Sequence, residues 1–503
     1  MSAVTAATGA AQSPALPAHL SRTHLIGIGG AGMSGVARIV LARGGAVSGS
    51  DAKDSAALQA VRGLGAKVAV GHAAANLDQL GADPTAIIST KAVHQSDPYN
   101  PELVEATRRG IPVIHRSEAL AALMAGYRVA CVTGTAGKTS TTSMLAVALQ
   151  RCGADPSFLI GGELATSGSG AHHGSGEIFV AEADESDGTF LAYSPDLAVV
   201  TNVEADHLDH HGSVEAYTAA FDAFAARLRP GGVLIANADD PGSAALADRA
   251  AAGGLRVRRY GALATPAAGA QLLAYTPDGD RGVATVALTE PAGGVHRMQV
   301  GVALPGRHMA SNAVAALLAG LELGLPLAGL LAGLAGFGGV RRRFELTGQV
   351  AGTRIYDDYA HHPTKVAAAL RGARQVVGRG RLLVAFQPHL YSRTRDFAAE
   401  FGAALALADV VLLLDVYGAR ERPIPGVTGA LIARAVPLPA GCVHYEPCWA
   451  DVPARLAQLA RPGDVVVTMG AGDVTALGPQ LIAELDRRWS DTSGLVARAA
   501  GSP

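Results

Sequence analysis

The chain has few of the features that mark secreted, membrane or nucleic-acid-binding proteins. Its 503 residues include only 4 cysteines, none of them in a CxxC pair, so the sequence indicates neither a disulfide framework nor a thiolate metal site. It contains no unbroken apolar run of about 18 residues, the length that a membrane-spanning helix needs. A basic excess is also missing, because 41 Lys and Arg face 43 Asp and Glu. We therefore expect a cytoplasmic protein with no membrane or nucleic-acid partner.

The residues that are abundant indicate an α/β protein. Hydrophobic residues make up 49% of the chain, aromatic residues only 5%, and there are 62 glycines. From residue 24 onward, short β-branched runs such as HLIGIG, KVAVG and AIIST alternate with helical patterns, which predicts parallel strands joined by crossover helices. The alternation restarts twice. We expect a disordered tail (1–22), a Rossmann-like domain (23–126), a central P-loop-type ATPase domain with a mainly parallel sheet (127–339) and a Rossmann-like C-terminal domain (340–503).

The segment VTGTAGKTSTTS, residues 132–143, is a shortened version of a phosphate-binding loop. Its glycines allow backbone amides to face phosphate oxygens, Lys138 can reach the β- and γ-phosphates, and the Thr139 hydroxyl can bind Mg²⁺. The alternative is a glycine-rich connection with a solvated lysine. The predicted ATP-binding residues of the loop are Gly134, Thr135, Ala136, Gly137, Lys138, Thr139 and Ser140.

Two acidic clusters follow later strands of the same predicted domain. EADES carries Glu182, Asp184 and Glu185, and TNVEADHLDHHG carries Glu204, Asp206, His207 and Asp209. Carboxylates packed this closely repel one another unless a cation offsets them, which Mg²⁺ does well. The alternative is a set of capping residues and solvated loops. We interpret His210 and His211 as loop residues, because no closed zinc site is indicated.

A second glycine-rich turn, GIGGAGMSG, opens the first predicted domain. It contains Gly29, Gly30 and Gly32, and there the start of the following helix can meet a diphosphate. Asp51 comes about 20 residues later, the spacing of a ribose-binding acid. The turn is not a full GxGxxG, so a nicotinamide dinucleotide need not be the ligand, and a tight turn without a ligand is the alternative.

Arginines cluster in the third predicted domain and at its start. Arg341, Arg342 and Arg343 lie at the domain junction, where one of them could stabilise phosphoryl transfer. Arg393 and Arg395 follow a strand and could clamp a carboxylate. A solvated charge run is the alternative for either group.

In their order along the chain, these motifs resemble those of the Mur ligases of peptidoglycan synthesis, and most closely the branch that adds alanine. The segments that carry the resemblance are GIGGAGMSG, TGTAGKTSTT, EADESD, EADHLDHHG, PGRHMASN, RRRFE, DDYAHHP, FQPHLYSRT and GAGD. The resemblance implies an ATP-dependent ligase acting on UDP-N-acetylmuramate and L-alanine, with Mg²⁺, as a monomer or homodimer. ATP would phosphorylate the lactyl carboxylate, and the alanine amine would attack the acyl phosphate.

The resemblance also assigns roles to residues of this chain. For ATP, it implies that His308 and Asn312 contact adenine, that Arg343 lies near the γ-phosphate and that Asp358 contacts the ribose. It matches Thr139, Glu182 and His207 to metal contacts, and Gly29, Gly30, Gly32, Asp51, His72 and Ser89 to the UDP-sugar. His361 and Arg393 match the amino-acid side, so the implied catalytic set is Lys138, His207, Arg343, His361 and Arg393.

Two departures, one further agreement and several alternatives accompany the resemblance. The alanine-adding branch usually has His at the position of Ala136 and often Arg at that of Leu390, whereas the absence of lysine from 208 to 240 agrees with that branch. Within the class, the rivals are a recycling ligase that adds a whole tripeptide and a folylpolyglutamate-synthase-like ligase. Outside it, an NAD-dependent oxidoreductase and a non-catalytic UDP-sugar-binding protein remain.

Overall fold

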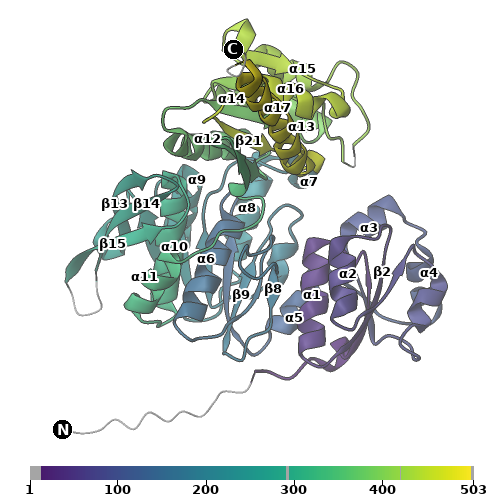
Figure 1. The fold of residues 1–503 in the computed structure, drawn as a ribbon. Coiled ribbons are helices and arrows are strands. Elements are labelled where there is room, and N and C mark those ends of the chain that lie inside the picture. The colour runs from purple at the N-terminus through teal and green to yellow at the C-terminus, as the bar shows by residue number, and fades with distance from the viewer. Residues whose placement is uncertain (1–12, 290–293, 420, 500–503) are drawn as a thin grey trace. The chain divides into compact units, whose positions relative to one another are not determined.

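The computed structural model describes residues 13–289, 294–419 and 421–499 (Figure 1). The described strands form sheets of five, ten and six strands, and each sheet falls within one of the three predicted domains. The prediction of three α/β domains is confirmed. By contacts the chain divides into two compact units, one holding the first two domains and the other holding residues 339–503 together with Tyr275–Val283 and Val302–Ala310.

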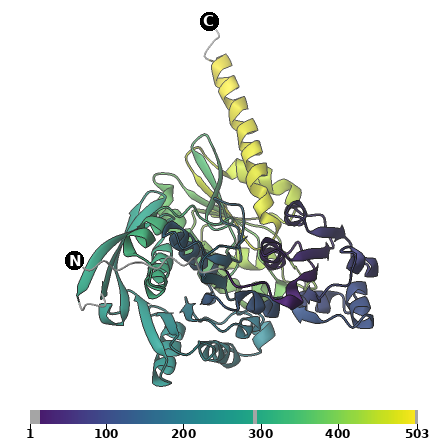
Figure 2. The same ribbon diagram turned by 90° about the horizontal axis from the view of Figure 1, so that it is seen from below.

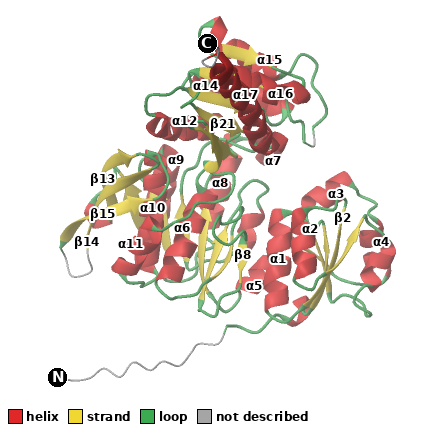
Figure 3. Cartoon of the chain, viewed as in Figure 1, coloured by secondary structure: helices red, strands yellow, loops and turns green. Residues whose placement is uncertain are grey.

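The first domain is an open parallel sheet in the order β3-β2-β1-β4-β5. Helices cover both of its faces (Figure 3), over two separate apolar clusters. Strand order reverses between β1 and β4, and ligands of such sheets bind at the carboxyl edge there. Its elements are η1 (Ala18–Leu20), β1 (Arg22–Ile26), α1 (Ala31–Ala42), β2 (Ala46–Asp51), α2 (Ala56–Gly63), β3 (Lys67–Val70), η2 (Ala74–Asp78), β4 (Ala86–Ser89), α3 (Lys91–Ser96), α4 (Pro101–Arg108), β5 (Val113–His115) and α5 (Arg116–Met124).

The expected disordered tail of residues 1–22 is too long. Residues 1–12 lie outside the described residues, but from Ser13 onward the chain packs onto the protein. Leu20 is fully buried, and the Arg43 guanidinium donates hydrogen bonds to the carbonyl oxygens of Pro14 and Ala15. Ordered structure therefore begins before the predicted boundary, because an apolar side chain and backbone carbonyls in this segment find partners on the first domain.

The central domain has a ten-stranded sheet in the order β15-β14-β13-β12-β11-β10-β6-β9-β7-β8. The strands around β6 are parallel, whereas β8 pairs antiparallel with β7. Its elements are β6 (Arg128–Thr133), α6 (Lys138–Arg151), β7 (Ser157–Leu159), β8 (Ala171–His172), β9 (Ile178–Glu182), η3 (Thr189–Ala192), β10 (Leu197–Val200), α7 (Leu208–His211), α8 (Val214–Ala225), β11 (Val233–Asn237), α9 (Pro241–Ala252), β12 (Arg256–Gly261), η4 (Pro266–Ala268), β13 (Gly269–Asp278), β14 (Arg281–Thr289), β15 (Val295–Val302), α10 (Arg307–Glu322) and α11 (Leu327–Ala335).

The C-terminal domain has a six-stranded sheet in the order β16-β17-β21-β18-β19-β20, in which only β16 pairs antiparallel among the described strands. Two apolar clusters contribute its core. Figure 2 shows its last helix, α17, as a long regular helix. Its elements are β16 (Glu345–Val350), β17 (Thr353–Asp358), α12 (Pro363–Val377), β18 (Leu382–Phe386), α13 (Tyr391–Asp396), α14 (Ala398–Leu405), β19 (Val410–Leu413), α15 (Gly429–Ala435), η5 (Ala440–Cys442), β20 (Val443–Tyr445), η6 (Trp449–Asp451), α16 (Val452–Leu459), β21 (Val465–Met469), η7 (Asp473–Ala476) and α17 (Leu477–Ala499).

Candidate functional site

The shortened loop between β6 and α6 is hydrogen-bonded to the residues that directly follow the neighbouring strand β10. Gly134 has φ 129° and Gly137 has φ 84°, conformations that glycine adopts without strain. The Ala136 amide donates to Asn202 Oδ1 at 2.7 Å, and the Thr201 hydroxyl donates to the Ala136 carbonyl at 2.6 Å. A side chain at Gly134 would collide with Thr201 and Asn202. The glycines are therefore required by the packing of the loop.

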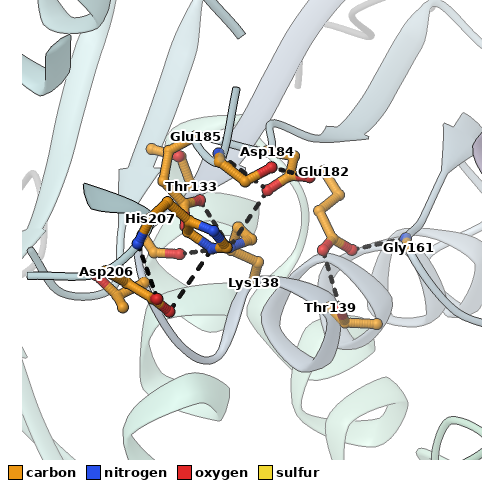
Figure 4. Close-up of polar contacts among 12 residues, drawn as sticks. Thr133, Lys138, Thr139, Gly161, Glu182, Asp184, Glu185, Asp206 and His207 are labelled. Atoms are coloured by element: carbon orange, nitrogen blue, oxygen red, sulfur yellow. Dashed lines mark hydrogen bonds and ion pairs between the residues drawn. The ribbon is translucent and has the colours of Figure 1, made fainter. Parts of the chain in front are cut away.

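Lys138 begins α6 and points back across the loop into the first acidic cluster (Figure 4). Its Nζ donates to the Gly134 carbonyl at 2.8 Å and to Glu185 Oε2 at 2.6 Å, and lies 3.8 Å from Asp184 Oδ1. Burial by itself would lower the pKa of Lys138, but the neighbouring carboxylates, Glu185 foremost, raise it above its ordinary value. The loop thus holds a permanent cation among acids.

Glu185 is the fully buried partner of that cation. Burial raises its pKa to about 7, although the Lys138 ammonium opposes the rise. Its Oε1 atom is buried and has no hydrogen-bond partner among the described residues. The pair is close and charged, but the carboxylate is incompletely satisfied, which is costly in a buried position.

Glu182 ends β9 and lies between the loop helix and a neighbouring strand end (Figure 4). Its Oε1 accepts from the Thr139 hydroxyl at 3.0 Å, and its Oε2 accepts from the Gly161 amide at 2.7 Å. A Cβ at Gly161 would lie 2.7 Å from Oε1, so only glycine leaves room for the carboxylate. The predicted metal contacts Thr139 and Glu182 therefore do lie together.

His207 precedes the one-turn helix α7 in the left-handed conformation, with φ 52°. Its amide donates to Asp206 Oδ1 at 2.9 Å, and its Nε2 lies 3.6 Å from Asp206 Oδ2. Within the described residues, no group of three or more His, Cys, Asp or Glu side chains converges as a metal cage. Any cation here would need ligands that a substrate or water supplies.

The interpretation of His210 and His211 as loop residues is wrong. Both lie in α7. His211 Nε2 is 2.9 Å from the Glu185 carbonyl, and its ring meets Tyr217 edge to face. This short helix has no side-chain cap and begins at a residue with positive φ, so ordinary helix signals do not reveal it.

Of the other predicted ATP contacts, Asn312 lies beside the loop, whereas Thr135 and Ser140 belong to it. A Cβ at Gly137 would lie 2.9 Å from Asn312 Oδ1, which places the mostly buried Asn312 against the loop. The Thr135 hydroxyl, by contrast, is 2.8 Å from the Tyr217 hydroxyl and donates to the Glu204 carbonyl. Ser140 is buried in the first turn of α6. Thr135 therefore holds the loop against the domain.

The glycine-rich turn after β1 closes on the predicted ribose acid. The Gly29 amide donates to Asp51 Oδ2 at 2.9 Å, and a Cβ at Gly29 would meet the same atom at 2.9 Å. The N-cap of α1 is Gly30, and a Cβ at Gly32 would lie 2.6 Å from Arg116 Nη1. A guanidinium therefore lies beside the predicted diphosphate turn, where it could offset phosphate charge.

The other two predicted UDP-sugar residues also follow strands of this sheet. His72 follows β3 by two residues, and 22% of its side-chain surface is exposed. Ser89 ends β4 but is only 1% exposed, and its hydroxyl has no partner among the described residues. Ser89 therefore reaches a ligand only if the strand end shifts.

In the C-terminal domain, the predicted ribose contact Asp358 ends β17. Its two carboxylate oxygens accept the amides of Phe344 and Ala360 at 2.9 and 2.8 Å. Burial raises its pKa to about 6, with Arg343 opposing the rise. The Arg343 guanidinium lies 5.0 Å from the centre of the Tyr359 ring. Asp358 fixes the start of this domain in addition to any ligand role.

Of the arginine run, Arg342 has a structural role. Its guanidinium donates to the carbonyls of Gly470 and Gly472 at 2.9 and 3.1 Å and lies 3.3 Å from Asp357 Oδ2. Its backbone has φ 60°, which directs the chain into β16. Arg342 thus ties the start of the domain to the end of β21.

The two residues predicted on the amino-acid side lie near each other. The His361 and His389 ring centres are 5.8 Å apart, and the buried Arg393 donates to His389 Nδ1 at 3.5 Å. Burial first, then Lys365 and Arg393, lowers the pKa of His361 well below its ordinary value. Leu390, which stands where the family often has Arg, is mostly buried with φ 70°.

A cavity of about 340 Å³ lies at the carboxyl ends of β18 and β19 in the same domain. Its lining comprises Gln387, Leu414, Asp415, Val416, Tyr417, Gly418, Ala419, Glu446, Pro447, Trp449, Val452 and Asp473. The lining combines three carboxylates with two aromatic rings, which suits a cationic amine. It includes neither His361 nor Arg393, so sequence reasoning did not identify this cavity.

The predicted adenine contact His308 lies in the first turn of α10. The ring is half-buried, and burial lowers its pKa to about 4, so it is neutral at physiological pH. The adjacent Gly306 amide donates to the Tyr275 hydroxyl at 3.0 Å and to Gln375 Oε1 at 3.1 Å. A neutral imidazole in this position can stack on a base without a charge penalty.

Sequence reasoning missed three residues of the candidate sites. They are Gly161, which accommodates Glu182; Asn202, which binds the loop amide; and Arg116, which lies at the first glycine-rich turn. Arg116 and Asn202 each come one or two residues after a strand, the same signal that identified Glu182. That rule, applied to every strand, would have found both.

Comparisons with known proteins agree with these motifs. Residues 22–128 match the model "Mur ligase family, catalytic domain", residues 132–320 match "Mur ligase middle domain" and residues 342–472 match "Mur ligase, glutamate ligase domain". A UDP-N-acetylmuramate--L-alanine ligase from Saccharopolyspora erythraea is 62% identical over 468 residues, covering 93% of this chain and 94% of the relative.

Solved structures are similar over nearly the whole chain. A UDP-N-acetylmuramate-alanine ligase from Thermotoga maritima superposes with a TM-score of 0.74 at 26% identity, covering 94% of this chain and 99% of that one. A murein peptide ligase from Psychrobacter arcticus has a TM-score of 0.66 at 24% identity, covering 92% and 98%, and shows the fold alone. No helix among the described residues has the length and apolar character to cross a membrane.

Proposed function

Because the chain belongs to the Mur ligase family, we propose that it is an ATP-dependent ligase joining L-alanine to the lactyl carboxylate of UDP-N-acetylmuramate in peptidoglycan precursor synthesis. The observation that carries this proposal is 62% identity over nearly the full length to a UDP-N-acetylmuramate--L-alanine ligase. The lysine of the shortened loop, placed among carboxylates, supports phosphate chemistry at the central domain.

The chemistry explains the need for ATP. A carboxylate is a poor electrophile, so transfer of the γ-phosphoryl group to a lactyl oxygen creates an acyl phosphate with phosphate as the leaving group. The alanine amine attacks its carbonyl carbon, the tetrahedral intermediate collapses, and phosphate and ADP leave. Positioning and charge neutralisation dominate such a reaction. Lys138 supplies a fixed positive charge for the phosphates, whereas the Thr135 and Ala136 amides of the loop are already bonded to Asn202.

The residues near the loop fit Mg²⁺. Mg²⁺ usually takes one or two protein oxygens as ligands, and water and substrate phosphates complete its octahedral coordination. Thr139 and Glu182 supply such oxygens 3.0 Å apart, and His207 is the further candidate. When bound, Mg²⁺ would neutralise phosphate charge. Glu182 then orients the Thr139 hydroxyl, and Gly161 keeps room for the carboxylate.

The remaining substrate contacts are proposals for separate domains. Gly29, Gly30, Gly32, Asp51, His72 and Ser89 serve the UDP-sugar, with Arg116 added as a diphosphate contact. His308, Asn312, Arg343 and Asp358 serve ATP, while His361 and Arg393 serve the alanine side. The cavity beside Tyr417 and Trp449 is a second candidate for recognising an amine in the C-terminal domain.

We also infer a cytoplasmic protein, present as a monomer or homodimer. The four cysteines are unpaired thiols, as expected in a reducing compartment. Sedimentation of the purified protein at several concentrations tests the oligomeric part, and fractionation of the source cells tests the location.

The decisive experiment measures ADP release with UDP-N-acetylmuramate and ATP against L-Ala, Gly, L-Ser, D-Glu and the tripeptide L-Ala-D-Glu-diaminopimelate. The proposal predicts the highest kcat/KM with L-Ala. Preference for the tripeptide would instead identify a recycling ligase. No ADP release with any amino acid would refute a ligase, and oxidation or reduction of a nicotinamide cofactor would identify an oxidoreductase.

A further inference from the structure

A second buried acid lies in the first domain, away from the phosphate-loop residues. Glu102 is in the first turn of α4 and is fully buried. It faces Ser50 near the end of β2, His24 on β1, and the segment from His72 to Asn76 that follows β3. Those strands end at the edge that carries Asp51 and the glycine-rich turn.

Both oxygens of Glu102 accept hydrogen bonds. Oε1 accepts from Asn76 Nδ2 at 2.6 Å and from the Ala73 amide at 3.3 Å. Oε2 accepts from the Ser50 hydroxyl at 2.6 Å, and His24 Nε2 lies 3.3 Å from it. A backbone amide can only donate, so the carboxylate is an acceptor on that side. Burial alone would raise the pKa of Glu102, but these donors lower it below its ordinary value.

The geometry fixes the direction of the hydrogen bonds beyond Ser50. A serine hydroxyl has one proton, and here it is given to Glu102. Ser50 Oγ can therefore only accept at its second contact, which is His72 Nδ1 at 2.8 Å. Nδ1 must carry a proton. A neutral imidazole has a single ring proton, so Nε2 of His72 is left with an unshared pair.

We propose that Glu102 and Ser50 are positioning residues that hold His72 in its Nδ1–H tautomer, so that Nε2 accepts a hydrogen bond from the nucleotide of the UDP-sugar. This inference rests on the proposed function for its ligand. The ligand must then donate a hydrogen bond to Nε2 of His72. Uridine diphosphate has two kinds of donor, the imide N–H of the base and the ribose hydroxyls. His72 is the partly exposed end of the chain Glu102–Ser50–His72, and the rest is buried.

The tautomer can be tested in the free protein. With ¹⁵N-labelled histidine, the His72 ring signals, assigned by their loss in His72→Gln, should show a protonated Nδ1 and a bare Nε2. In Glu102→Gln the amide can donate to Ser50 Oγ, which lets the Ser50 hydroxyl donate to Nδ1 and moves the ring proton to Nε2. Ser50→Ala removes the constraint with a smaller change to the core, so His72 should show a mixture of tautomers.

The control is Glu105→Gln on the same helix. Glu105 forms ion pairs with Arg108 and Arg109 and has no contact with this chain of hydrogen bonds. It should leave the His72 signals unchanged. A His72 ring already protonated at Nε2 in the wild type would overturn the proposal, as would an unchanged tautomer in both Glu102→Gln and Ser50→Ala.

Binding then tests the consequence. Loss of one such hydrogen bond should weaken UDP binding by about tenfold in Glu102→Gln, with the KM for ATP unchanged. The donor to His72 is identified by the analogue that binds about tenfold more weakly than UDP to the wild type but no more weakly than UDP to Glu102→Gln. N3-methyl-UDP tests the imide N–H, and 2′-deoxy-UDP and 3′-deoxy-UDP test the ribose hydroxyls. Undiminished binding of UDP by Glu102→Gln would refute the role of the tautomer. Failure of the wild type to bind UDP would refute the proposed function instead, while the tautomer measurement stands.

Discussion

Glu102 in the first domain and Glu185 in the central domain are both fully buried, but their surroundings differ. Glu102 has donors to both oxygens, and against the effect of burial its pKa is lowered by His24 first, then by Ser50 and Asn76. Glu185 has one close cation, Lys138, and an Oε1 atom with no partner among the described residues, and burial raises its pKa to about 7. One acid is saturated with hydrogen bonds and the other is not.

The difference fits two kinds of work. A saturated carboxylate keeps its charge and its geometry, which suits a residue that orients a neighbour. An unsaturated carboxylate beside a lysine is poised for charge exchange, because an incoming phosphate competes for the same ammonium. On the functions proposed above, Glu102 positions a neighbouring residue, whereas Glu185 responds to the bound nucleotide.

Lys138→Ala should have the largest effect, because it leaves Glu185 buried without its cation and removes the charge that we propose offsets the transferred phosphoryl group. Groups of this kind are worth on the order of 10²–10³ in rate. Steady-state ADP release measures the loss, and near-ultraviolet circular dichroism checks the fold. A folded variant that keeps more than about a tenth of wild-type activity would contradict the role of Lys138.

Glu182→Ala and His207→Ala should come next. Each removes a proposed Mg²⁺ contact, and changes at metal sites and their supporting residues commonly cost about 10–100-fold in metal affinity. A Mg²⁺ titration of ADP release should therefore shift to higher concentration in both variants. The matched control is Asp196→Asn, which removes a carboxylate that pairs with Arg229 in the same domain. Titration curves that coincide with wild type would remove both residues from the metal site.

The sequence predicted the charged residues of the central site better than the neutral ones. Lys138 was found from the motif of the shortened phosphate-binding loop. Glu182 was found because it follows a strand, a rule that needs only the alternation of strands and helices. Gly161 was missed because its function depends on β7 pairing with β9, and strand order is not contained in the alternation. Glu102 was missed for the same reason, since its partners are on β1, β2 and η2.

The pH dependence of stability should show the contrast between the two acids directly. Because the pKa of Glu185 is raised, the folded state holds the proton of this carboxyl more tightly than the unfolded state between pH 4.5 and about 7. The contribution of Glu185 to the free energy of unfolding therefore falls as pH rises through that window. The lowered pKa of Glu102 gives the opposite pH dependence. Its contribution to the free energy of unfolding is present above pH 4.5 and is lost as pH falls.

Thermal unfolding midpoints measured without ligand from pH 4 to 8 separate the effects of the two acids. The proteins to compare are the wild type, Glu185→Gln and Glu102→Gln. The difference between wild type and Glu185→Gln should shrink from pH 4.5 to 7, whereas the difference for Glu102→Gln should shrink only towards acid. If the two differences in thermal midpoint changed with pH in the same direction, the distinction between a saturated and an unsaturated acid would be wrong.

Ala136→His should have the smallest effect and probes the loop without altering either acid. The Ala136 amide and carbonyl are already bonded to Asn202 and Thr201, and those bonds involve backbone atoms that the substitution keeps. Ala136 is half-buried, so an imidazole has room to project from the loop. We expect kcat within about threefold of wild type, a change of about 0.6 kcal/mol, because the substitution keeps the backbone bonds of the loop and leaves Lys138 in place. Steady-state kinetics with ATP and UDP-N-acetylmuramate varied in turn measures it. A folded variant without activity would show that this loop meets its nucleotide differently from the loops of its relatives, because a side chain that the family usually carries would then obstruct the site.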